Sequence, residues 1–205
     1  NDEKEDKPFA LSINQLLIYD GRFRFDIQNA PFKEGVLDPS HIDINGIRCN
    51  ISLRELHKER LDLLVRSVGG VEKSGLEIEK FKARLKSSDN TIRVSGMEIS
   101  FPNSSLVSDS ISMVFDKNNA KATSITGDIR SPRTNLSDFT ALYPGFSQEI
   151  PEISFSLYNH TDSTLSRTEL TASAAEGNVS LKSIATIETP YDNDRKINLY
   201  VRDLD

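Results

Sequence analysis

Residues 92–115 read IRVSGMEISFPNSSLVSDSISMVF, and apolar side chains recur at nearly every second position. Alternate side chains of an extended chain point to the same side, so Ile92 and Val94, and after a break at Gly96 Ile99 and Phe101, fall on one face. The Pro-Asn-Ser-Ser segment that follows has the composition of a turn. The stretch therefore predicts antiparallel strands with one apolar face.

The same alternation returns, with turn residues between the strands, from Phe9 to Val201. It predicts an all-β chain that is mostly a one-faced sheet. A sheet with a single apolar face must bury that face in a core or use it to hold an apolar ligand.

Composition limits the partners. The 205 residues carry a net charge of −6 and are 37% hydrophobic and 27% charged. Lys and Arg are scattered among acids rather than clustered, which argues against nucleic acid as a partner. The single cysteine, Cys49, alternates with Ile47 and Ile51 and is expected to be buried in a strand, without an intrachain disulfide.

The chain has no apolar run long enough for a transmembrane helix and no signal-peptide pattern at its start. Residues 1–8 are nearly all charged or polar and predict a disordered lead-in. Residues 9–205 are expected to form a single β-rich segment of a longer, repeat-like protein, because the last strand pattern, at 197–201, runs to the end of the sequence.

Glycine-containing turns divide the strands. Asp20-Gly21 predicts a hairpin between strands at 9–19 and 22–28. Asn45-Gly46 predicts a second turn, between 42–44 and 47–53, where the change from even to odd apolar positions also requires a flip or a bulge. Gly69-Gly70 and a charged loop are expected to end the next strand.

Two stretches have helical spacing. Leucines between 53 and 64 allow a helix, but the pattern at 61–65 favours a strand. Residues 135–143 predict one or two helical turns, because Asn135 can cap the start and Pro144-Gly145 ends the pattern.

Catalytic motifs are missing from the sequence. His41, His57 and His160 have no metal-binding spacing and are interpreted as solvent-exposed. Lys73-Ser74-Gly75 is interpreted as a turn, and there is no Gly-x-Ser-x-Gly elbow, P-loop or dinucleotide-binding fingerprint. We therefore expect no enzyme activity, no catalytic or metal-binding residues and no cofactor.

Four segments carry a resemblance. Residues 61–78, with their Glu-Lys-Ser-Gly turn, resemble a stretch of the AsmA/TamB-like envelope proteins of Bacteroidetes. Residues 36–44 (Val-Leu-Asp-Pro-Ser-His-Ile-Asp-Ile), 97–106, and 137–138 with 142–146 are similar to further segments of that family, in the same order, over roughly residues 9 to 200. Gly70 and Val71 depart from the family pattern.

The resemblance implies an elongated, curved antiparallel sheet with one or two short helices, whose concave face is a β-taco-like hydrophobic groove. It also implies a periplasmic protein that is anchored in the inner membrane through a segment not present here. Proteins of this family are implicated in phospholipid transport and in outer-membrane assembly. Phospholipid acyl chains, the membrane and an outer-membrane assembly protein are therefore the expected partners.

Physical chemistry is compatible with this function. Exposing two acyl tails of about 16 carbons to water would cost on the order of 25 kcal/mol, so a conduit needs a continuous apolar lining. Alternating strands provide one. The expected groove residues are Phe23, Phe25, Ile27, Ile92, Val94, Ile99, Phe101, Phe155, Leu157 and Leu199.

An alternative is a secreted or surface β-sandwich used for adhesion or glycan binding, in which Phe23, Phe25 and Ile27 are core residues facing a second sheet. Sugar sites usually use exposed aromatic rings, and this chain has no Trp and is only 7% aromatic, which disfavours the alternative.

Overall fold

The computed structural model describes residues 10–57, 60–116, 122–146, 152–174, 180–188 and 196–204, the last three of these, 202–204, by their backbone alone. The predicted lead-in at 1–8 lies outside these residues. The described residues form eleven strands and one short 3-10 helix. The elements are β1 Leu11–Asp26, β2 His41–His57, β3 Arg60–Glu72, β4 Glu77–Ser88, β5 Thr91–Ser100, β6 Ser105–Phe115, β7 Ala122–Thr134, η1 Leu136–Phe139, β8 Ile153–Thr161, β9 Leu165–Ala174, β10 Ser180–Glu188 and β11 Lys196–Leu204.

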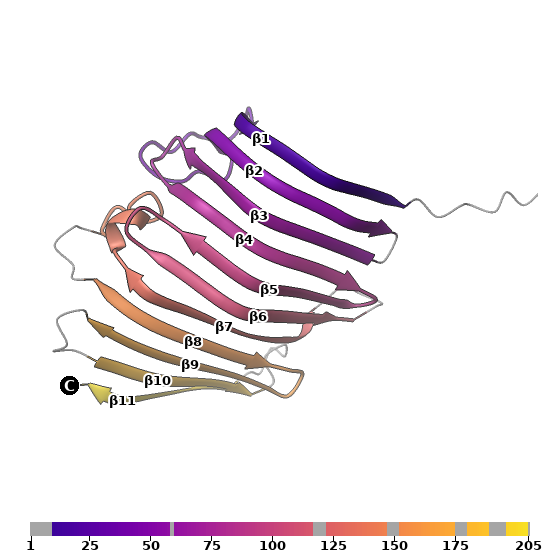
Figure 1. Cartoon of the computed structure of the whole chain (residues 1–205). Coiled ribbons are helices and arrows are strands. Elements are labelled where there is room, and N and C mark those ends of the chain that lie inside the picture. Colours follow the sequence, from indigo (N-terminus) through magenta and orange to yellow (C-terminus); the bar gives the residue numbers. More distant parts are fainter. Residues whose placement is uncertain are drawn as a thin grey trace, which may run out of the picture.

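All eleven strands belong to one antiparallel sheet, in which each strand pairs with its neighbours in the sequence, from β1 at one edge to β11 at the other (Figure 1). Ten spacings of about 4.8 Å make the sheet roughly 50 Å long. The sheet is open and not closed into a barrel. The all-β, elongated antiparallel fold expected from the sequence is therefore confirmed.

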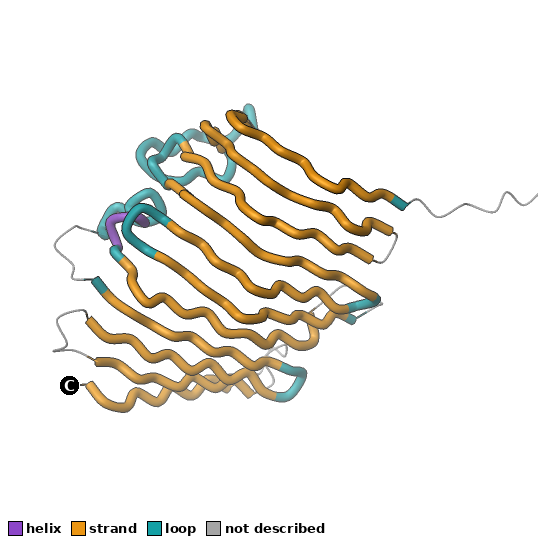
Figure 2. The backbone as a smooth tube through the Cα atoms, in the orientation of Figure 1, coloured by secondary structure: helices purple, strands orange, loops and turns teal. Residues whose placement is uncertain are grey.

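No second layer covers this sheet within the described part of the chain. All substantial contacts between strands join neighbours in the sheet order. Figure 2 shows strands across the whole width of the sheet, with loops and the short helix only at its ends. The two-sheet packing considered for Phe23, Phe25 and Ile27 is thus not found among these residues.

Two predicted hairpins are wrong. The strand β1 runs straight through Asp20-Gly21, and β2 runs through Asn45-Gly46. Each site is a β-bulge instead, with a register shift next to Gly21 in the pairing of β1 with β2 and a shift after Asn45 in the pairing of β2 with β3. Gly46 has φ of +61°. Glycine, which favours tight turns, here occupies a bulge position instead. The sequence also predicted a flip or a bulge at Asn45-Gly46, and the bulge is confirmed.

Gly69-Gly70 also lies within a strand, since β3 continues to Glu72. A Cβ atom on Gly69 would lie 2.5 Å from the backbone oxygen of Glu79, so glycine permits a close approach of β3 to β4. The chain turns later, at Lys73-Ser74-Gly75, where the N–H of Gly75 donates to the Glu72 carbonyl over 2.8 Å. The turn predicted there is confirmed.

The short helix forms where it was expected. The side chain of Asn135 accepts a hydrogen bond of 3.0 Å from the backbone N–H of Ser137 and caps η1. One 3-10 segment follows, and the described residues between 53 and 64 are strands.

Three loops at one end of the sheet contact each other, and we call them the end cap: residues 27–40, 101–104 and 135–146. Leu37 donates its N–H to the Ala141 carbonyl over 2.6 Å. The rings of Phe101 and Phe139 pack edge to face with centroids 4.9 Å apart. Phe101 and Ala141 are two of the five buried apolar side chains among the described residues. The end cap therefore holds a large share of the buried core.

We predict that Gly96, a bulge residue of β5 with φ of +57°, tolerates no β-carbon without strain. A β-carbon at this position would have no other atom within 4 Å, so the backbone conformation alone sets the cost. Gly96→Ala should lower the free energy of unfolding by about 1–2 kcal/mol, and Gly96→Asn by less, because Asn adopts positive φ more readily. Urea titration followed by circular dichroism measures both. Equal stability of the Ala variant and the parent chain would contradict the bulge.

Candidate functional site: the apolar face of the sheet

Cross-strand pairing defines an apolar face. One row of directly paired residues contains Leu53, Leu63, Leu85, Val94 and Ile111, from β2 to β6. Directly opposed residues of neighbouring strands point to the same side, so these side chains form one continuous stripe across five strands. Each of the five is half-buried. We use "apolar face" for the side of the sheet on which this row lies.

The row changes character beyond β6. Ile111 is paired with Gly127, and the next partners are Asn159 and Thr168, whose side chains hydrogen-bond to each other over 2.8 Å. Closer to the end cap, a parallel row of Ile129, Leu157 and Leu170 stays apolar. The apolar stripe therefore continues across β7 to β9, displaced toward the end cap.

The opposite side of the sheet, which we call the charged face, carries ion pairs between neighbouring strands. Arg84 of β4 donates two hydrogen bonds to Asp62 of β3, the shorter of 2.6 Å. The bond from Arg84 holds the pKa of the Asp62 carboxyl below its ordinary value, so the carboxyl is charged at neutral pH. Further pairs are Arg22 with Asp43, Lys82 with Glu98 and Arg130 with Asp109.

Most of the predicted groove residues share the apolar face. Val94 and Leu199 lie in one row through Ile111, Gly127, Asn159, Thr168 and Ala185. Ile99 pairs with Phe81, and Leu157 pairs with Ile129. The remaining strand residues that the pairing places there are Phe23, Phe25, Ile92 and Phe155.

Two predicted groove residues have a different setting. Phe101 is 9% exposed and is packed against Phe139 in the end cap, so it does not line an open surface. Ile27 lies just beyond β1, where its N–H donates to the Ser40 carbonyl over 2.8 Å. Both belong to the end cap rather than to the strands of the apolar face.

An apolar hollow of about 340 Å³ lies on this face between the strands and the end cap. Ile44 and Ile47 flank Gly70 at close range, since a Cβ on Gly70 would lie 3.0 Å and 3.5 Å from their side chains. The sequence did not point to this hollow, because it needs the bulges of β2 and β3 and a loop residue, Leu37. Its lining is Leu37, Ile42, Ile44, Ile47, Val68, Gly69, Gly70, Glu72, Leu76, Ile78 and Phe81.

Other expectations about single residues have mixed outcomes. Cys49 is buried, at 7% exposed, as predicted. The side chain of His41 is only 14% exposed, so its interpretation as a solvent-exposed histidine is wrong. It is enclosed because Asp26 and the loop after β1 fold against it, contacts that sequence spacing does not reveal.

Comparison with known proteins gives no relative: no family model, no curated protein and no solved structure matches the chain. In the described ranges, no three or more His, Cys, Asp or Glu side chains are grouped so that they could hold a metal ion. A search of the same residues finds no helix with the length and apolar character needed to cross a membrane.

Replacing a phenylalanine by alanine should lower the free energy of unfolding more in the end cap than on the apolar face. Phe101→Ala should lower the free energy of unfolding by about 3–4 kcal/mol, because it empties a buried, ring-packed site. Phe25→Ala, at a side chain that is 45% exposed on the apolar face, should cost about 1 kcal/mol. Urea titrations of the two variants give the comparison, and equal losses would show that the face around Phe25 is covered.

Proposed function

We propose that the chain is a lipid-conduit segment of an AsmA/TamB-like envelope protein, which guides phospholipid acyl chains between the inner and outer membranes. The observation that supports this proposal is a continuous apolar stripe on a single-layered sheet, with no covering layer among the described residues. The proposal includes a periplasmic location, an inner-membrane anchor in a segment outside this sequence, and a partner in outer-membrane assembly.

The mechanism would be passive. An acyl chain on the apolar face would gain about 0.8 kcal/mol for each methylene removed from water. Apolar side chains repeat from strand to strand at about 4.8 Å, so an acyl chain that slides along the face would leave one side chain and meet a similar one ahead. This chain's residues would supply only the lining, without covalent or redox chemistry.

The two faces of the sheet would have different roles. The ion pairs of the charged face keep that side hydrated, so a bound lipid would be confined to the apolar face. At β8 and β9 the polar pair of Asn159 and Thr168 would direct the tail toward the row of Ile129, Leu157 and Leu170. A role in surface adhesion or glycan binding stays the alternative prediction.

Site-specific photo-crosslinking tests the proposal. A benzoylphenylalanine at Val94, on the apolar face, should form adducts with phospholipid when the chain is incubated with phosphatidylethanolamine and phosphatidylglycerol vesicles. The matched control places the same probe at Arg93, the preceding residue, which pairs with Lys86 and Ser112 on the charged face. Mass spectrometry of the labelled chain reports the adduct.

The expected result is a mass increase of one phospholipid at position 94 and none at position 93. Equal labelling at both positions would indicate non-specific contact with the vesicle. Absence of labelling at both, with the fold retained by circular dichroism, would remove the lipid-conduit function.

A further inference from the structure

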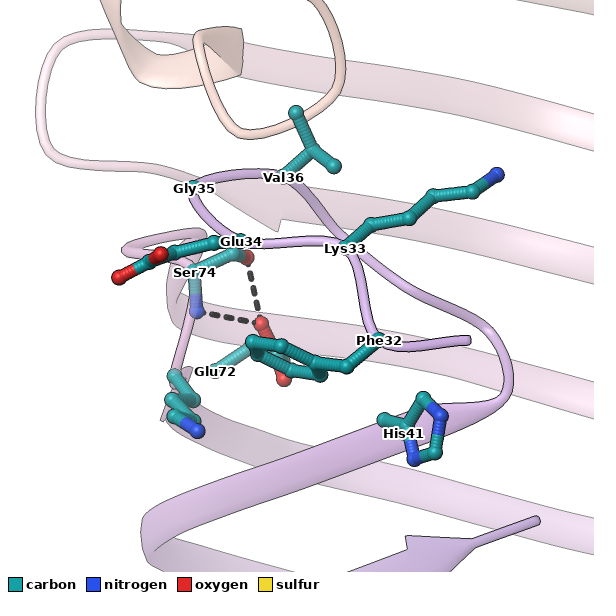
Figure 3. Close-up of a pocket in the computed structure, with 9 residues that line it drawn as sticks. Phe32, Lys33, Glu34, Gly35, Val36, His41, Glu72 and Ser74 are labelled. Carbon is teal, nitrogen blue, oxygen red and sulfur yellow. Dashed lines mark hydrogen bonds between the residues drawn. The ribbon is translucent and has the colours of Figure 1, made fainter. Parts of the chain in front are cut away.

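The loop between β1 and β2 joins the two faces of the sheet. Phe32 lies beside His41 (Figure 3). Both residues line a hollow together with the charged groups Asp26 and Arg24. A few residues later, Leu37 lines the apolar hollow on the other face. The same loop therefore connects the surroundings of His41 with the rim of the hollow.

His41 is bonded through both ring nitrogens. Its Nδ1 contacts the carboxylate of Asp26, and its Nε2 lies 2.9 Å from the carbonyl oxygen of Ala30. Both partners are acceptors, and a neutral imidazole carries only one N–H. The arrangement is therefore complete only when the ring is protonated.

Further contacts connect this histidine to the loop. The ring of Phe32 packs edge to face on His41 with centroids 5.6 Å apart, and the ammonium group of Lys73 lies 4.6 Å from the centre of the Phe32 ring. Asp38, which is 4% exposed, accepts bonds of 3.0 Å from the backbone N–H groups of Lys33 and Ser40.

Charged groups from each neighbouring element surround the ring. Asp26 comes from β1, and its carboxylate oxygen lies 3.5 Å from the guanidinium nitrogen of Arg24. Asp38 comes from the loop itself. The hydrogen bond to Asp26, followed by the bond to the Ala30 carbonyl, raises the pKa of His41 above its ordinary value, although burial opposes the shift. The remaining charged groups that line the adjoining hollows are Arg22, Lys33, Glu34, Asp43, Glu72 and Lys73.

We propose that protonated His41 holds the loop 27–40 in place in a pH-sensitive way, through the hydrogen bonds of its two ring nitrogens. Loss of its proton loosens Leu37 at the rim of the apolar hollow. Loosening of the rim widens the entrance to the hollow. The proposed role of His41 does not depend on what occupies the hollow, so it can be tested independently of the lipid-conduit function.

The direction of the pH dependence follows from the raised pKa of the folded state. The stabilisation of the loop by protonated His41 is fully present below about pH 6.5, the ordinary pKa of histidine. It is lost as the pH rises through the pKa of His41 in the folded chain. Asp26 or Ala30 then faces a ring nitrogen that has no proton to donate.

Amide hydrogen exchange by NMR, together with the titration of the His41 ring, measures this switch. Between about pH 5 and about pH 8, the range in which the charge of histidine changes, protection of the Leu37 N–H should fall in step with deprotonation of the His41 ring. After correction for intrinsic exchange rates, we expect a loss of about fivefold, the effect of one hydrogen bond. The N–H of Phe115, bonded to the Asn90 carbonyl where β5 and β6 meet away from the end cap, serves as an internal reference.

Two variants complete the test. His41→Gln should show low and pH-independent protection of the Leu37 N–H, whereas His160→Gln, which alters a histidine beside Thr126 and Asp162, should keep the response of the parent chain. Constant protection of Leu37 while the His41 ring titrates would overturn the proposal. A response that persists in His41→Gln would do the same, and the parent-chain titration decides if that variant fails to fold.

Discussion

The structure depends on one constraint: a single β layer cannot bury its own apolar face. Sheets in globular proteins cover such a face with helices or with a second sheet. Here the described residues place strands only beside strands, and the five buried apolar side chains are Cys49, Val65, Ala83, Phe101 and Ala141. Backbone ladders, ion pairs on the charged face and the end cap hold the sheet together, and the apolar face is left available.

Alternation in the sequence was sufficient to predict the sheet, because strand periodicity is a local property. The cap at Asn135 and the turn at Lys73-Ser74-Gly75 were also predicted from local chemistry. So was the turn at 102–105, except that Ser105 already belongs to β6. The hairpins at Asp20-Gly21 and Asn45-Gly46 were not correct, since the same residue types occur in tight turns and in bulges. Pairing of β1 with β2 along nearly their whole length, although bulges interrupt it, outweighs the local turn preference.

Residues of the site were predicted less completely than the fold. Alternation alone could assign Phe23, Phe25, Val94 and Leu199 to the apolar face. It could not place Phe101 correctly, because the burial of Phe101 depends on Phe139 of η1. The apolar hollow combines three strands with Leu37, and His41 is enclosed by Asp26 and Ala30. Such contacts arise from register and loop path, which single-sequence patterns do not determine.

The proposed function requires that the apolar face is open and holds hydrocarbon chains. Native mass spectrometry of the chain purified without detergent, with chloroform extraction and analysis of the same sample, tests it most directly. The account predicts phospholipid bound in a defined ratio, which is released when the chain is unfolded in urea. A preparation that is folded by circular dichroism, carries no lipid and takes none up from vesicles would contradict it.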